Sequence, residues 1–178
     1  MRLKKKPFLI IGVMLFVLAM SMNAFAAPAS SLSLSAPGPF NVNDTFDLKI
    51  NITGTGNFTG LDETITFPVA NLQVTAVTIN PTVTSGAITY SNGVVAPNTT
   101  NANNPAHADA GKLKFTGSTS DSAGLAPISP LVTVTFKCTT AGTNLQIGGT
   151  YSVTDTSFGT FSSPAYSVPA MNLFRLSR

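Results

Sequence analysis

The sequence contains few of the residues that enzymes and metal-binding proteins use most. Its 178 residues include one Cys, one His and no Trp, and only 10% of them are charged. The single cysteine, Cys138, excludes an intramolecular disulfide, and one thiol with one imidazole cannot supply the usual ligands of a zinc site. The low charged fraction weakens an enzyme interpretation. Together with 14 Gly, 12 Pro and many Thr, it is typical of an all-β protein of one domain.

The positive charge of the chain is concentrated at its amino terminus. Four of the ten basic residues lie in the first six positions, an apolar run from Phe8 to Met20 follows, and Ala24-Phe25-Ala26 comes next. This order predicts a secretory signal peptide over residues 1–26, since the apolar run is too short to span a bilayer comfortably. Residues 27–178 contain six basic and seven acidic residues, which gives a net charge of −1. We therefore expect neither a nucleic-acid partner nor membrane insertion.

Residues 27–178 show short runs of alternating apolar and polar side chains, separated by turn residues. This period of two, without a convincing helical segment, predicts one β-sandwich of about nine strands. A change of phase near Val74 predicts a bulge, and Asn92-Gly93 predicts a hairpin turn. The predicted strands include Leu32–Ala36, Phe46–Ile52, Leu61–Phe67, Leu72–Ile79, Ile88–Tyr90 with Val94-Val95 returning after the hairpin turn, Leu113–Phe115, Val132–Cys138, Leu145–Ile147, Tyr151–Val153 and Tyr166–Val168.

No residue pattern predicts a catalytic or metal site. The only imidazole, His107, lies with Asp109 in the polar stretch Pro97–Ala110, which we interpret as a mobile surface loop. The sequence has no G-x-S-x-G turn that would present a nucleophile to this histidine. The loop acids Asp109 and Asp121 lack the D-x-[DN]-x-[DN]-G spacing of a calcium loop, so we interpret them as solvated. The strand phase of Cys138 predicts a buried and inert thiol.

Glu63 conflicts with the strand pattern around it. It shares one face of its strand with Leu61, Ile65 and Phe67. A buried carboxylate without a partner is costly. We therefore expect this end of the strand to be open to water, or the carboxylate to be partnered, and we do not interpret it as a general acid.

Two blocks of the sequence resemble bacterial cohesin domains. Residues 43–77, NDTFDLKINITGTGNFTGLDETITFPVANLQVTAV, are similar to a pattern of V-G-D-T, an alternating strand, a G-x-D-F strand and Y-D-P-x-x-L-x-V. Residues 111–143 contain LVTVTFK and an A-G-T turn, similar to the L-x-T-I-T-F-K strand and turn of the family. The departures are Asn43 for Gly, Glu63 for Phe, and Phe67-Pro68 without the intervening Asp.

This resemblance implies a nine-stranded jelly-roll sandwich that acts by non-covalent binding. In cohesins one sheet face docks a dockerin module through the Asp of the G-x-D-F strand, which matches Asp62. Thr64 and Thr66 share that face by alternation. Thr119 stands where the family often has an acid on the following strand. The resemblance thus implies Asp62, Thr64, Thr66 and Thr119 as partner-binding residues.

Three functions remain open from the sequence. We expect first a secreted, extracellular or periplasmic, non-catalytic module that docks a dockerin-type protein without a cofactor, in a polysaccharide-degrading or cell-surface assembly. A polar sheet face centred on Asp62 favours this function. The second is direct polysaccharide binding, which a flat row of exposed aromatic side chains favours. The third is a structural or adhesive surface subunit, which a long uncovered edge strand favours.

Overall fold

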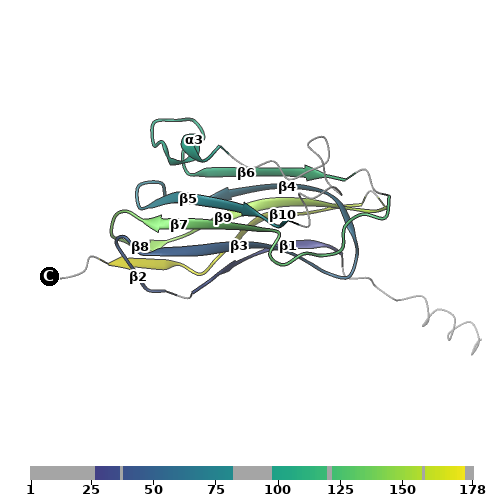
Figure 1. Cartoon of the computed structure of the whole chain (residues 1–178), viewed down its shortest axis with the longest axis horizontal. Helices are drawn as coiled ribbons and strands as arrows, with labels where there is room; N and C mark the ends of the chain where they lie inside the picture. The colour runs from purple at the N-terminus through teal and green to yellow at the C-terminus, as the bar shows by residue number, and fades with distance from the viewer. Residues whose placement is uncertain (1–26, 37, 82–97, 120–121, 158, 175–178) are drawn as a thin grey trace, which may run out of the picture.

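The structure is a computed structural model that describes residues 27–36, 38–81, 98–119, 122–157 and 159–174. Within these ranges the chain forms eleven strands and one short helix (Figure 1). They are β1 (Ala29–Leu34), β2 (Phe40–Asn41), β3 (Thr45–Thr53), β4 (Phe58–Thr66), β5 (Leu72–Ile79), α3 (Thr99–Asn103), β6 (Lys112–Ser118), β7 (Val132–Cys138), β8 (Gly142–Leu145), β9 (Gly148–Asp155), β10 (Thr160–Ser167) and β11 (Met171–Phe174).

Two antiparallel sheets form the layers of a sandwich. One has the strand order β1-β3-β7-β5 and the other has the order β10-β9-β4-β6. The alternation in the sequence decides which face of each strand is buried. In β3, for example, Phe46, Leu48 and Ile50 are buried while Asp47 and Lys49 point outward. The predicted all-β sandwich is confirmed.

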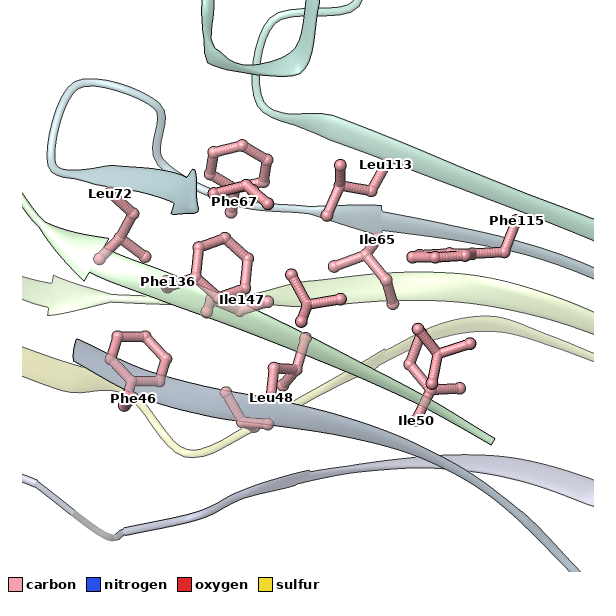
Figure 2. Packing of buried hydrophobic residues seen from close by; sticks show 14 of the residues in the cluster. Phe46, Leu48, Ile50, Ile65, Phe67, Leu72, Leu113, Phe115, Phe136 and Ile147 are labelled. Carbon is pink, nitrogen blue, oxygen red and sulfur yellow. The ribbon is translucent and has the colours of Figure 1, made fainter. Parts of the chain in front are cut away.

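Aromatic side chains fill one end of the core between the sheets. The rings of Phe40 and Phe46 stack at 4.6 Å, and those of Phe46 and Phe136 stack at 5.6 Å between centroids. Phe67, beyond the end of β4, meets Phe136 edge-on at 5.1 Å. Figure 2 shows the side chains of Phe46, Phe136 and Phe67 pointing toward one another between the two layers. These contacts stabilise the sandwich beyond the burial of the rings alone.

A small third sheet closes one end of the molecule. Its order is β2-β11-β8, with β11 parallel to β2 and antiparallel to β8. The sequence pattern predicted about nine strands, fewer than the eleven in the described residues. The strands β2 and β11, with two and four residues, are too short to show a clear alternation. Whether residues 171–178 form a strand or a tail was left open by the sequence, and Met171–Phe174 are a strand.

The predicted bulge in β5 is confirmed, whereas the predicted loop 97–110 is only partly correct. The register between β5 and β7 shifts between Val74 and Ala76. Helix α3 forms within the predicted loop, where Asn98 accepts a hydrogen bond from the backbone nitrogen of Asn101 and caps the helix. The helix was not predicted because five residues are too few to show an amphipathic period.

Several other predictions can be placed on the fold. Cys138 is fully buried, as its strand phase predicted. The predicted signal peptide and the predicted hairpin at Asn92-Gly93 lie outside the described residues. None of the helices in the described ranges is long and apolar enough to cross a bilayer.

Candidate functional site

The outer face of the sheet β10-β9-β4-β6 carries three of the four predicted partner-binding residues. In β4, Leu61, Glu63 and Ile65 are buried, and this alternation turns Asp62, Thr64 and Thr66 outward together. The pairing of β4 with β6 and β9 places other polar residues beside them on the same face. We call this surface the β4 face; its central residues are Asp62, Thr64, Thr66, Lys112, Lys114, Thr116, Gly148, Thr150 and Ser152.

Thr119, the fourth predicted residue, does not lie with the other three. It follows the last residue of β6, and its backbone nitrogen donates to the Thr59 oxygen at 2.8 Å. Alternation gives it the opposite orientation to Lys114 and Thr116. It lines a narrow slot with Phe58 and Leu125 that has a volume of about 10 Å³. The structure therefore brings Asp62, Thr64 and Thr66 together and leaves Thr119 at the edge.

One ion pair crosses the β4 face. The Lys114 Nζ lies 3.4 Å from the Asp62 Oδ2, and the two side chains are 63% and 54% exposed. Such an exposed pair contributes little to stability, about 0 to 1 kcal/mol. Asp62 is nevertheless not an isolated acid, since a lysine on the neighbouring strand offsets its charge. The sequence alone did not pair these residues because they are far apart along the chain.

Two shallow hollows mark the β4 face, each of about 390 Å³. They lie on either side of Thr64, which lines both of them. The first is lined by Thr64, Thr66, Gln146, Gly148, Gly149, Thr150 and Ser167. The second, which we call the lysine hollow, is lined by Thr64, Asn98, Asn101, Asp109, Lys112 and Lys114.

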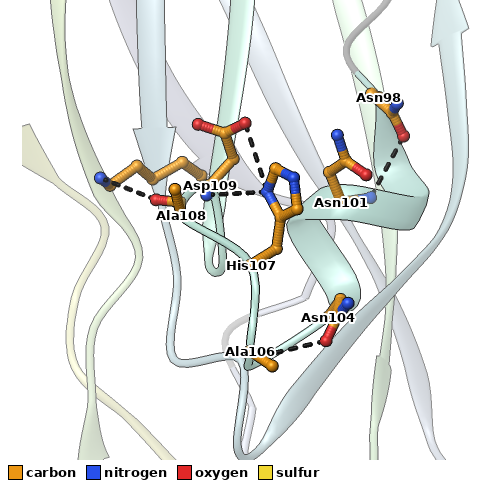
Figure 3. A network of polar contacts seen from close by, with 8 residues as sticks. Asn98, Asn101, Asn104, Ala106, His107, Ala108 and Asp109 are labelled. Atoms are coloured by element: carbon orange, nitrogen blue, oxygen red, sulfur yellow. Dashed lines mark hydrogen bonds and ion pairs between the residues drawn. The ribbon is translucent and has the colours of Figure 1, made fainter.

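The segment 98–111 forms the wall of the lysine hollow. Its last residues are held against the sandwich, because the Gly111 nitrogen donates to the Ala102 oxygen and Ala102 is buried. His107 and Asp109 lie side by side in this segment, with 3.4 Å between Nδ1 and Oδ2 (Figure 3). The Asp109 backbone nitrogen also donates to the same His107 nitrogen at 3.1 Å. No group of three or more His, Cys, Asp or Glu side chains suited to a metal ion occurs among the described residues.

The outer faces of the two sheets differ in how their polar side chains are used. On the sheet β1-β3-β7-β5, the Asp47 Oδ1 accepts from the Thr135 hydroxyl at 2.8 Å, and the Asn51 amide donates to the Ser33 hydroxyl at 3.1 Å. On the β4 face, no hydrogen bond of the Thr64 side chain is found within the described part of the chain. Its hydroxyl therefore remains available to a partner.

Glu63 lies beneath the β4 face as a fully buried side chain. The expectation that its end of the strand is open to water is wrong, and the alternative, a partnered carboxylate, is confirmed. The Ser30 hydroxyl on β1 donates to the Glu63 Oε2 at 2.8 Å across the sandwich. Ser30 was missed in the sequence because it is a small polar residue in a serine-rich strand, although its inward phase was visible there.

The arrangement of the two sheets is the fold of cohesin modules. The structure is similar to the CaCohA2 module of Clostridium acetobutylicum, with a TM-score of 0.57 and 16% identity over 84% of this chain and 92% of that one. It is also similar to the sixth cohesin of Acetivibrio cellulolyticus scaffoldin B, solved in complex with a Cel5 dockerin mutant. That match has a TM-score of 0.56 and 12% identity, and covers 82% and 99% of the two chains.

A third similar structure is the cohesin module of a family 33 glycoside hydrolase from Clostridium perfringens. Its TM-score is 0.55 at 13% identity, over 83% of this chain and 98% of that module. No family model matches the sequence, and no curated protein matches it. The identity of these structures is low, so they establish the fold, and they bear out the cohesin-like architecture that the motifs implied.

Proposed function

We propose that the protein is a secreted, non-catalytic, cohesin-like module that docks a dockerin-type protein on the β4 face. The main support is the near-complete coverage of cohesin modules by this chain, 99% for the scaffoldin B cohesin, whose structure includes a dockerin. The similar cohesin module of a glycoside hydrolase supports an assembly that includes enzymes acting on glycosidic bonds. The signal peptide predicted over residues 1–26 supports export of the module.

The β4 face suits a protein partner because it presents solvent-accessible polar groups on a rigid sheet, among them the Thr64 hydroxyl, which makes no hydrogen bond within the described residues. Asp62 and Thr66 are exposed, and Thr64 lies between them at the floor of both hollows. The sheet beneath is anchored by fully buried residues such as Ile65 and Phe115. Hydroxyl and carboxylate groups held on such a frame form directed hydrogen bonds to a partner at a low cost in conformational entropy.

The two other functions have less support in the described residues. A sugar-binding strip needs exposed aromatic rings, and the only large hydrophobic side chain found exposed in the described ranges is Phe174, on β11. A structural subunit would assemble by pairing another strand with an open sheet edge. At the edge strand β5, the Asn103 side chain already bonds the backbone nitrogen and oxygen of Val74, both at 2.8 Å. This contact closes part of that edge to another strand.

The proposal is tested by measuring the affinity of residues 27–178 for dockerin modules encoded by the source organism. Thr64→Arg places a bulky side chain in the middle of the β4 face and should abolish binding. The matched control is Thr133→Arg, at an equivalent outward position on a central strand of the other sheet. A dockerin that binds the wild type and Thr133→Arg but not Thr64→Arg supports the proposal. Binding that is lost only in Thr133→Arg, or that no dockerin shows, refutes it.

A further inference from the structure

We infer that the lysine hollow receives a carboxylate side chain, Asp or Glu, from the docking partner. This inference rests on the proposed function and adds the chemistry of the partner's contacting residue. It locates the contact at the junction of β6 with the segment 98–111, beside the pair of Lys114 and Asp62. The argument depends on the charges that the hollow leaves without an opposite charge.

Of the two lysines that line the hollow, Lys112 is the one without an ion pair among the described residues. Its Nζ lies 3.5 Å from the Ala108 backbone oxygen, at the outer limit of a hydrogen bond. No carboxylate within the described ranges comes close enough to form an ion pair with it. Its ammonium group therefore keeps most of its hydrogen-bonding capacity, although its stem lines a hollow.

The two acids near the hollow differ in their partners. Asp62 pairs with Lys114 at 3.4 Å, whereas Asp109 lies 3.4 Å from a His107 nitrogen that accepts a hydrogen bond from the Asp109 backbone. The lining of the hollow therefore contains two ammonium groups and one carboxylate, that of Asp109, and a further carboxylate would complement this excess of positive charge. A carboxylate placed between Lys112 and Lys114 would meet two ammonium groups, because these residues lie two apart on one face of β6.

Amide groups on α3 complete the hollow as hydrogen-bond donors. The Asn98 Oδ1 is used to cap the helix, since it accepts from the Asn101 nitrogen at 3.1 Å. The group that the Asn98 side chain has left is therefore its Nδ2 donor. Figure 3 shows Asn98 and Asn101 close together on the same side of the helix. Two ammonium groups and the amide donors outnumber the one carboxylate, Asp109, around this hollow of about 390 Å³, so the lining matches an anionic side chain better than a basic one.

The first test measures affinity for a dockerin that binds the wild-type module. Lys112→Glu reverses the charge in the hollow, and Lys137→Glu makes the same change on β7, in the other sheet. We expect Lys112→Glu to weaken binding at least about tenfold at low salt, with a smaller ratio at high salt because exposed charges are screened. Lys137→Glu should change the affinity less than about twofold. Equal affinities for the two variants would overturn the inference while leaving the proposed function intact.

The second test does not need a dockerin. A short soluble peptide with two adjacent Glu residues, and the same peptide with Gln in their place, are titrated into isotopically labelled protein and followed by NMR. Shifts confined to Lys112, Lys114, Thr64 and Asn101, seen with the Glu peptide and absent with the Gln peptide, support the inference even if every dockerin fails to bind. Shifts that are equal for both peptides, or that lie elsewhere, overturn it.

Discussion

Replacing Ser30 should destabilise the sandwich more than its small size suggests. Its hydroxyl is the donor to a carboxylate that is fully buried between the sheets. Glu63 lies opposite Phe115 on one neighbouring strand and Tyr151 on the other, so its surroundings are largely aromatic. Ser30→Ala removes the donor and leaves the carboxylate in place, and a buried polar group that loses a partner costs about 1 to 3 kcal/mol.

The second step of this prediction removes the carboxylate as well. Glu63→Met has a similar length and no charge, and it should pack against Phe115 and Tyr151. With Ser30→Ala also present, both partners of the Ser30–Glu63 hydrogen bond are replaced by apolar groups, so no buried carboxylate is left without this donor. We therefore expect the double variant to be more stable than Ser30→Ala alone. The coupling free energy between the two sites should be about 1 to 3 kcal/mol.

Urea unfolding followed by circular dichroism measures the four members of this cycle. The dependence of the unfolding free energy on urea should be the same in all four, because the surface exposed on unfolding barely changes. The control is Ser31→Ala on the same strand, whose side chain has the opposite orientation. If Ser30→Ala unfolds at the wild-type midpoint, or if the double variant loses the sum of the two single losses, the hydrogen bond has no stabilising role.

Three further predictions concern the edge of β5, the buried thiol and the packing of β9. Asn103→Ala should lower the unfolding free energy by about 1 to 3 kcal/mol, because Val74 loses two hydrogen bonds; an unchanged urea midpoint would contradict this. Burial, and then the Asp44 carboxylate, raise the pKa of Cys138. The native thiol should resist iodoacetamide, and stability should fall as pH rises above the unfolded thiol's pKa of about 8.5, at most about 1.4 kcal/mol per pH unit more steeply than in Cys138→Ala; equal slopes would contradict this. Gly149→Ala should unfold at lower urea, since its Cβ would overlap a β4 carbonyl oxygen; a wild-type midpoint would refute that overlap.

The strand pattern was predictable where inward and outward side chains alternate along a long strand, as in β3 and β7. β3 and β7 show this alternation over nine and seven residues, and both were predicted within one residue. The short elements were not predictable for the same reason, since β2 and α3 have too few residues to show any period. Contacts between distant segments, such as Lys114 with Asp62, depend on the register of two strands, which the sequence pattern does not contain.

Alternation also could not decide which sheet presents the binding surface, because both sheets turn Thr and Ser outward. The two outer faces differ in the hydrogen bonds and hollows that form only in the folded chain. On the sheet β1-β3-β7-β5 the outward groups of Asp47 and Asn51 bond to neighbouring side chains, and Asn51 is only 8% exposed. On the β4 face, residues of the segment 98–111 line one side of the lysine hollow, and Thr64 also lines it. The Thr64 hydroxyl, which makes no hydrogen bond within the described residues and lines this hollow, is therefore the physical reason to propose the docking site there.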